Sequence, residues 1–228
     1  MATVEESIPP LVEGQRLTRD EFLRRWEAHP EINKAELIGG TVFMPSPLSV
    51  EHAVMDSDVG GWLLAYRSAT PGTESGHNAT SLIREETPQP DNFLRILPEY
   101  GGGSRIEGKY LGGRPELLVE ICGSSASYDL HDKLELYQAA RIPEYLAVLL
   151  FEKEVRWHRL LGRRYKLLSP DRDGLLRSRV FPGLWLDSKA LLEGNIQQVL
   201  ARLQEGLNSP EHKRFVAKLA RRKRAGKP

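Results

Sequence analysis

The sequence predicts a single α/β domain in which a mixed β-sheet is flanked by helices. Short apolar runs that end in glycine, proline or serine indicate strands, and amphipathic stretches before, between and after them indicate helices. The chain of 228 residues is 40% hydrophobic and 28% charged, an ordinary globular composition that can fill one core. Because we find no internal repeat and no clear linker, we assign residues 16–207 to one domain.

The first half of the chain carries helix and hairpin signals after an acidic, proline-bearing lead-in. Residues 1–15 are expected to be mobile. Thr18 is placed to N-cap a helix, with Glu21 at the capping-box position, and Gly39-Gly40 separates two short strands as a hairpin turn does. The expected elements are helices at 18–26 and from about 49 into the mid-60s, strands on either side of 39–40 and at 72–74, 80–84 and 91–97, and a long flexible loop at 98–113.

The second half continues the alternation of strands and helices. A strand, a helix and another strand come first, and antiparallel strands and a final helix follow. The expected elements are strands at 117–121 and 144–150 with a helix from about 128 to 140 between them, two or three strands at 154–160, 163–169 and 177–186, and a helix from 188 to about 207. Residues 208–228 are assigned to a basic C-terminal tail.

Composition also argues against several classes of protein. No apolar run approaches the ~18 residues of a transmembrane helix, and the N-terminus lacks the basic start and apolar stretch of a signal peptide. Cys122 is the single cysteine, so neither an internal disulfide nor a CxxC zinc site can form, and we expect it to be a small buried hydrophobe. A cytoplasmic protein is therefore expected.

Charge is unevenly placed along the chain. Residues 211–228 hold eight Lys or Arg against one Glu, whereas the remaining residues hold 24 basic and 30 acidic side chains. A basic segment on an acidic body suggests contact with a polyphosphate or an anionic surface. The candidate nucleic-acid contacts are Arg221, Arg222, Lys223 and Arg224. A solvated, frayed C-terminus is the alternative.

A glutamate lies inside an apolar strand. In PELLVEICGSS, residues 115–125, the residues around Glu120 read as a short buried strand. A buried carboxylate must be desolvated, paired or bound to a metal, because an isolated buried charge is costly. The alternative is an edge strand whose wet face carries Glu116, Leu118, Glu120 and Cys122.

Two further residues are candidates to gather near Glu120. Lys133 lies beside the apolar stripe of the following helix, where a lysine is unexpected unless it pairs with Asp129 or reaches solvent. Pro90-Asp91 opens another strand, although a Pro-Asp pair is usually just a turn. Two carboxylates, waters and a phosphate oxygen form the site that Mg²⁺ prefers, and a lysine beside it can hold or deprotonate a water. We interpret the ordered set as one metal-dependent site.

With these motifs the sequence resembles the Uma-two family of restriction endonucleases, within the PD-(D/E)XK nuclease superfamily. The resemblance runs from about Thr18 to Leu186. It is carried by AELIGG and the following FMPSP, by His52, by Pro90-Asp91, and most strongly by PELLVEICGSSASYDLHDKLELYQAARIPEYLAV. It implies a restriction-endonuclease-like nuclease domain over residues 16–207.

The family pattern implies a role for each catalytic candidate. Asp91 and Glu120 would be the metal ligands, and Lys133 would orient or deprotonate the attacking water. The superfamily's lysine usually lies two positions after the glutamate, where this chain has Cys122. The resemblance therefore implies that the lysine has moved from the strand to the next helix.

Two further residues match the family less specifically. Glu36 in AELIGG resembles the extra acidic catalytic residue of such sites, and His52 matches a family histidine that would be auxiliary. From the residues alone, Glu36 can equally be an ordinary hairpin carboxylate. His52 can equally cap its helix or make a structural hydrogen bond there.

The resemblance predicts a Mg²⁺-dependent DNA endonuclease, with Mn²⁺ able to substitute, that leaves 5′-phosphates. Many nucleases of this fold dimerise to cut two strands, so a homodimer is also expected. Two alternatives stay open. One is a nucleic-acid-binding protein that keeps the fold but has lost useful catalysis, and the other is a metal-dependent hydrolase of another phosphate ester.

Overall fold

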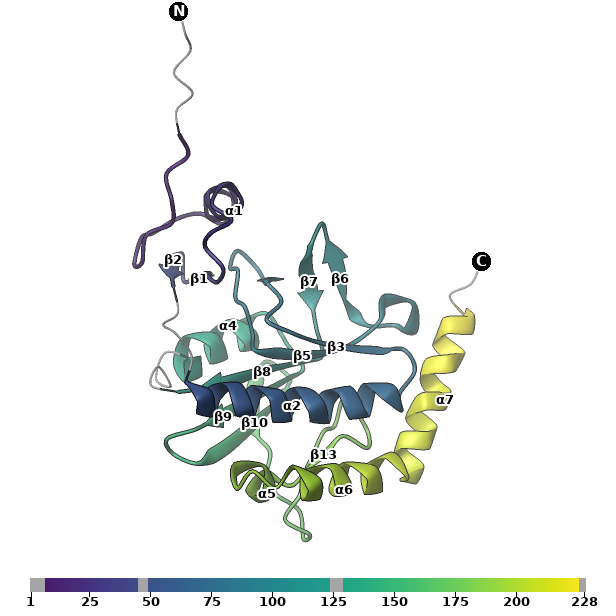
Figure 1. Cartoon of the computed structure of the whole chain (residues 1–228). Coiled ribbons are helices and arrows are strands. Elements are labelled where there is room, and N and C mark those ends of the chain that lie inside the picture. The colour runs from purple at the N-terminus through teal and green to yellow at the C-terminus, as the bar shows by residue number, and fades with distance from the viewer. Residues whose placement is uncertain (1–6, 45–48, 124–128, 226–228) are drawn as a thin grey trace, which may run out of the picture.

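A six-stranded mixed sheet forms the centre of the molecule in the computed structural model, which describes residues 7–44, 49–123 and 129–225 (Figure 1). The strand order is β11-β10-β9-β8-β5-β3. The pair β8–β9 is parallel and the other neighbouring pairs are antiparallel, so the predicted mixed sheet is confirmed. The strands are β3 (Thr73–His77), β5 (Asn92–Ile96), β8 (Leu117–Cys122), β9 (Glu144–Leu149), β10 (Glu154–Leu161) and β11 (Arg164–Leu167).

Helices cover both faces of this sheet. On one face lie α2 (Val50–Ser68), α5 (Ser188–Leu192), α6 (Ile196–Leu207) and α7 (Pro210–Ala225). On the other face lies α4 (Leu134–Ala139), which follows a π-helical turn, η2 (Asp129–Lys133). Helix α2 begins where it was expected, with Ser49 as its N-cap, and Tyr128, the expected start of the next helix, lies outside the described residues. No helix in the described ranges has both the length and the apolar character needed to cross a bilayer.

Strand β8 is an interior strand. It is bonded to β5 on one side and to β9 on the other, and all of its residues are buried. The alternative of an edge strand with a wet face is therefore wrong. Because side chains alternate along a strand, Val119 packs toward α2, whereas Leu118 and Cys122 pack with Tyr137 of α4. Glu120 shares this second face.

A small N-terminal layer lies beside the sheet (Figure 1). It contains α1 (Arg19–Ala28) and the hairpin of β1 (Glu36–Ile38) and β2 (Thr41–Phe43). The Thr18 hydroxyl accepts a hydrogen bond from the backbone N–H of Glu21 at 3.4 Å, which confirms the predicted N-cap. Gly39 and Gly40 have φ values of 58° and 71°, as a two-residue hairpin turn requires.

The stretch 7–16 runs along this hairpin. Gly14 donates its backbone N–H to the carbonyl of Val42 at 2.8 Å, and Leu11 is buried in the N-terminal core. Residues 1–6 of the expected lead-in lie outside the described residues.

The glycine-rich stretch 98–113 is ordered, so its prediction as a long flexible loop is wrong. It forms η1 (Pro98–Tyr100), β6 (Gly103–Glu107) and most of β7 (Tyr110–Arg114), and β7 also pairs with β4 (Ser81–Leu82). A Cβ added at Gly102 would lie 1.8 Å from the carbonyl oxygen of Ile96, and Gly108 turns the hairpin with a φ of 63°. These glycines serve close packing and turning rather than flexibility.

The C-terminal part differs from expectation in three places. Instead of one strand at 177–186, two short strands, β12 (Leu176–Arg177) and β13 (Trp185–Leu186), pair across a turn. The expected helix at 188–207 is divided into α5 and α6 because Gly194 adopts a φ of 71°. The basic tail continues as α7, which packs on the core through His212, Phe215 and Leu219.

Candidate active site

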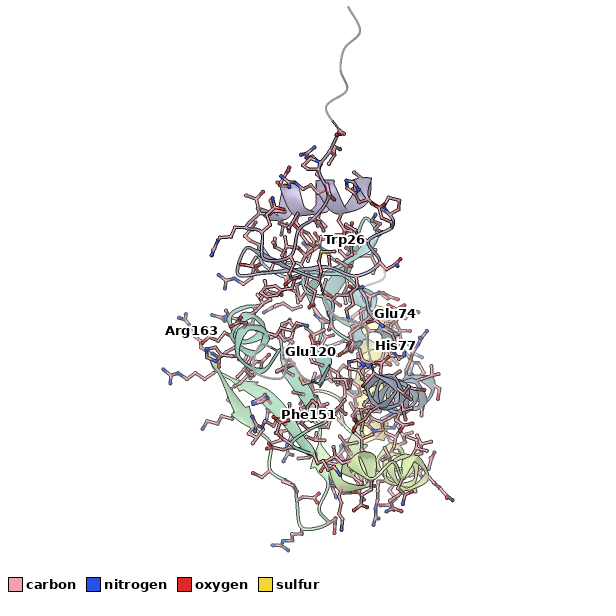
Figure 2. All side chains as sticks on the ribbon, turned by 60° about the vertical axis from the view of Figure 1, so that its left-hand side comes forward. Trp26, Glu74, His77, Glu120, Phe151 and Arg163 are labelled. Carbon is pink, nitrogen blue, oxygen red and sulfur yellow. The ribbon has the colours of Figure 1, made fainter. Side chains whose placement is uncertain are left out.

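Glu120 points from β8 toward the layer of α4 and lies near the middle of the molecule (Figure 2). It is 2% exposed. The hydroxyl of Tyr137 donates to its Oε1 at 2.7 Å, and Nζ of Lys133 lies 3.0 Å from its Oε2. Side chains of the next helical segment therefore compensate this carboxylate, which explains why an apolar strand tolerates a glutamate.

Lys133 ends the π-helical turn η2 and is 3% exposed, so it does not reach solvent. Its Nζ lies 3.0 Å from Oε1 of Glu36 and 3.0 Å from Oε2 of Glu120. The side chain of Asp129 and the serine-rich turn at 124–127 lie outside the described residues. π-helical turns are rare and are often found at functional sites, and here the turn delivers an ammonium group to two buried carboxylates.

Asp91 immediately precedes β5 and lies opposite Glu120. Asn92 is paired with Val119, so Asp91 and Glu120 stand at the next position of the antiparallel register. The Oδ2 atom of Asp91 accepts the backbone N–H of Ile121 at 2.8 Å. The Pro-Asp turn thus places a second carboxylate beside the first.

Two basic side chains hold Asp91 from outside the sheet. Nζ of Lys34 lies 3.4 Å from Oδ1, and Nε2 of His52, in the first turn of α2, lies 3.6 Å from Oδ2. The structure therefore connects Glu36, His52, Asp91, Glu120 and Lys133 through direct contacts and register. It brings together every residue that the sequence nominated except the basic ones of α7.

The family model Uma2, described as "Putative restriction endonuclease", matches residues 19–189, well over half of the chain. The chain belongs to this Uma2 family. The resemblance stated from its motifs is thereby confirmed, and family membership supports a nuclease function.

A solved structure shows the same fold. It is described as a "putative nuclease belonging to DUF820 from Anabaena variabilis ATCC 29413", with a TM-score of 0.59 and 16% sequence identity. The match covers 77% of this chain and 99% of that chain. No curated protein matches the chain. The restriction-endonuclease-like fold is therefore confirmed.

In this Uma2 chain the contacts of Asp91 favour its charged form. Burial alone would raise its pKa, but His52, Lys34, the N–H of Ile121 and Lys133 together lower the pKa below its ordinary value. The same contact with Asp91 raises the pKa of His52 in spite of burial. Asp91 is therefore an ionised carboxylate at neutral pH, as a metal ligand must be.

Two other buried glutamates differ from Glu120 in their partners. Glu116 accepts the backbone N–H groups of Ile96 and Gly103 at 2.7 and 2.8 Å. Glu144 accepts the hydroxyl of Ser178 at 2.7 Å and the backbone N–H of Arg179 at 2.8 Å, and burial raises its pKa to about 7. These two carboxylates satisfy backbone groups of turns and strands. Glu120 instead contacts the ammonium of Lys133 and the phenol of Tyr137.

The oxygen donors of the site fit a small, hard cation. No group of three or more His, Cys, Asp and Glu that would form a complete metal cage occurs within the described ranges. Mg²⁺, however, usually keeps several waters and binds through one or two carboxylates together with phosphate oxygens. Asp91, just before β5, and Glu120, on the neighbouring strand β8, offer such a pair.

The basic residues of α7 lie elsewhere. Figure 1 shows α7 on the other side of the molecule from α4, and Lys223 donates to the hydroxyl of Tyr100 at 3.0 Å while Arg222 packs beside Gly101. These contacts hold the end of α7 against η1. The cluster Arg221–Arg224 is thus a separate surface.

Three residues that complete the site were not predicted from the sequence. Lys34 contacts Asp91, Tyr137 donates to Glu120, and Gln89 donates its backbone N–H to Glu36 at 2.5 Å. Tyr137 was visible as part of the apolar stripe. Lys34 directly precedes the AELIGG motif, and Gln89 directly precedes Pro90-Asp91. This closeness in the sequence was the only available signal.

Proposed function

We propose that this chain is a Mg²⁺-dependent DNA endonuclease that hydrolyses phosphodiester bonds. The observation that carries the proposal is the buried ammonium of Lys133 within 3.0 Å of Glu120, whose register partner is the ionised Asp91. Membership of the Uma2 family supports the nuclease class. Mn²⁺ is expected to substitute for Mg²⁺, because both favour oxygen ligands.

Each residue has a role that its contacts support. A bound Mg²⁺ would supply Lewis-acid activation of the phosphate and of water, with Asp91 and Glu120 as its protein ligands. Lys133 would orient the attacking water and counter the negative charge that develops on phosphorus. Tyr137 fixes the rotamer of Glu120 through its hydrogen bond, and Glu36 holds Lys133 from the other side.

His52 and Lys34 act on Asp91 rather than on substrate. Both lie within 3.6 Å of its carboxylate oxygens and keep it ionised. We assign them as positioning residues. His52 would thereby take the auxiliary role that the family resemblance implies.

A direct experiment tests this function. Purified protein is incubated with plasmid, linear duplex and single-stranded DNA in Mg²⁺, Mn²⁺ or EDTA, and the ends are analysed. We expect cleavage in either metal, 5′-phosphate ends, and no cleavage in EDTA. Cleavage that persists in EDTA would contradict the metal-dependent mechanism, and an intact substrate under all conditions would contradict the enzyme assignment.

A second candidate function rests on the burial of the site. Glu36, His52, Asp91, Glu120 and Lys133 are each no more than 7% exposed. A nucleic-acid-binding protein that keeps the nuclease fold without useful catalysis would tolerate such a closed site. In the experiment above it would bind DNA in all buffers and leave it uncut.

We propose that the outer face of α7 contributes phosphate contacts. Deleting residues 211–228 is an unsuitable test because Phe215 and Leu219 belong to the core. The double variant Arg221→Gln with Arg224→Gln removes two exposed charges instead. We expect weaker DNA binding and a slope of log affinity against log salt that is shallower by about 0.9 for each lost contact.

The matched control neutralises two arginines on another surface. Arg163 and Arg164, at the β10–β11 turn, are also exposed, and Figure 2 shows Arg163 projecting from the molecule. Arg163→Gln with Arg164→Gln should leave the salt slope unchanged. Equal slopes in the wild type and the α7 variant would show that this face is merely solvated.

A further inference from the structure

A pocket of about 420 Å³ lies beside the candidate active site. It is formed by the end of α1 and the residues that follow it, by the segment after β3, and by the tip of the β6–β7 hairpin. Figure 2 shows Trp26, one of its lining residues, in the N-terminal layer. Its volume is within the range of pockets that bind small organic groups.

Two aromatic rings contribute apolar surface to this pocket. The Nε1 of Trp26 donates to the carbonyl of Ile32 at 2.7 Å, and the hydroxyl of Tyr110 donates to Glu27 at 2.7 Å. The polar atoms of both rings are therefore engaged within the protein. Lys109 lies over the Tyr110 ring at 5.3 Å from its centroid, and Phe22 packs against Trp26 at 5.4 Å. The ring surface that remains exposed is suited to a flat aromatic ligand, because such a ligand stacks on rings of this kind.

Three amide side chains line the same pocket, those of Asn33, Asn78 and Gln89. Each amide offers a donor and an acceptor, the combination that pairs with the edge of a nucleobase. Gln89 is 8% exposed, and its Nε2 donates to the carbonyl of Asn78 at 2.7 Å. Its buried Oε1 receives no hydrogen bond from the described part of the chain. This oxygen has almost no exposed surface, so a ligand reaches it only if the Gln89 side chain shifts.

The charges of the pocket argue against a phosphate as its ligand. Its two charged lining residues, Lys109 and Glu27, pair with each other at 3.3 Å. A phosphate would require unpaired cations, whereas a neutral base requires flat apolar surface and amide groups. The pocket provides the latter.

The pocket is joined to the candidate active site by two residues. The backbone N–H of Gln89 donates to Glu36, which in turn contacts Lys133. Nζ of Lys34 lies 3.5 Å from Oδ1 of Asn78 and 3.4 Å from Oδ1 of Asp91. A group bound in the pocket is therefore one side chain away from the carboxylates that we assign to the metal.

From this geometry we infer that the pocket binds one unstacked nucleobase of the DNA substrate, next to the phosphate that is cut. The inference rests on the proposed function and adds a specificity subsite to it. The cost of unstacking the base is offset by stacking on the rings and by the hydrogen bonds of the amides. Because Lys34 contacts both Asn78 and Asp91, it would link binding in the pocket to the position of the Asp91 carboxylate.

The test is a double-mutant cycle between the base and the pocket. The probe is the DNA form that the wild type cuts best, with an abasic nucleotide placed in turn at each position near the mapped cut. Affinity is measured by fluorescence anisotropy in EDTA, so that the probe stays intact. In the wild type we expect one position at which base removal weakens binding by roughly 5- to 100-fold.

Two pocket variants should abolish this dependence. Tyr110→Ala removes a ring, and Asn33→Ala removes an exposed amide whose loss leaves the core untouched. Tyr110→Phe keeps the ring and should retain most of the effect. Phe151→Ala removes a ring that is 74% exposed and distant from the pocket in Figure 2, and it should behave as the wild type does.

The outcomes separate the two proposals. If the wild type cuts DNA but no abasic position matters, or if the effect persists in Tyr110→Ala and Asn33→Ala, the pocket does not bind a substrate base. If free nucleoside monophosphates bind in a Tyr110-dependent way without any abasic effect, the ligand is a free nucleotide and the inference is overturned. If the wild type neither binds nor cuts DNA, the proposed function fails and the inference fails with it.

Discussion

Lys133→Met is expected to lower the rate of DNA cleavage by about 10²- to 10⁴-fold, the usual cost of losing a positioned proton-transfer or charge-stabilising group. The same substitution should destabilise the fold at pH 7 by about 3–5 kcal/mol, because it leaves a buried ion pair without one partner. The reason is geometric. Nζ of Lys133 lies 3.0 Å from both Glu36 and Glu120, and all three residues are buried.

Urea unfolding of the wild type and of Lys133→Met at pH 7 measures this loss of stability.

Two comparison variants separate folding from chemistry. Lys133→Arg keeps a cation between Glu36 and Glu120, so it should retain much of the stability but lose rate, because the guanidinium is larger and planar. Lys189→Met removes a lysine whose side chain is 84% exposed, and it should change stability by no more than about 0.5 kcal/mol. Cleavage by Lys133→Met at the wild-type rate would show that this lysine has no part in the mechanism.

The sequence could identify the main residues of the site because local patterns mark them. A carboxylate inside an apolar strand and a lysine beside an apolar helical stripe are both improbable without partners, and the structure pairs them with each other. The structure also shows the surroundings of Cys122, which stands two positions after Glu120. Cys122 is fully buried in a cluster with Tyr137 and Tyr145, so an ammonium at that position would enter an apolar core.

Other features could not be predicted, because they depend on contacts between distant segments. The stretch 98–113 resembled a flexible loop because glycine gives the same signal in a mobile loop and in a tightly packed strand. The approach of Gly102 to Ile96 decides between them, and it exists only in the folded chain. The roles of Lys34 and Gln89 likewise depend on how the N-terminal layer sits against Asp91 and Glu36. Periodicity within one segment carries no information on such contacts.

Removing either proposed metal ligand is expected to abolish most of the stabilisation that divalent ions give. A cation that binds only the native state stabilises it by about 2.7 kcal/mol when its concentration is 100 times the dissociation constant. The melting temperature of the wild type should therefore rise in millimolar Mg²⁺ or Mn²⁺. In Asp91→Asn and in Glu120→Gln the rise should be much smaller, because each variant keeps the size of the side chain but loses an anionic ligand.

Glu116→Gln is the matched control for this experiment. Glu116 precedes β8, is buried as Glu120 is, and accepts backbone N–H groups of Ile96 and Gly103 rather than contacting Lys133. Its replacement should lower the melting temperature in EDTA but leave the rise caused by metal intact. Loss of the metal response in Glu116→Gln as well would point to general destabilisation. An equal rise in the wild type, Asp91→Asn and Glu120→Gln would mean that the cation binds elsewhere, and Lys133 and Tyr137 would then have to account for the burial of Glu120.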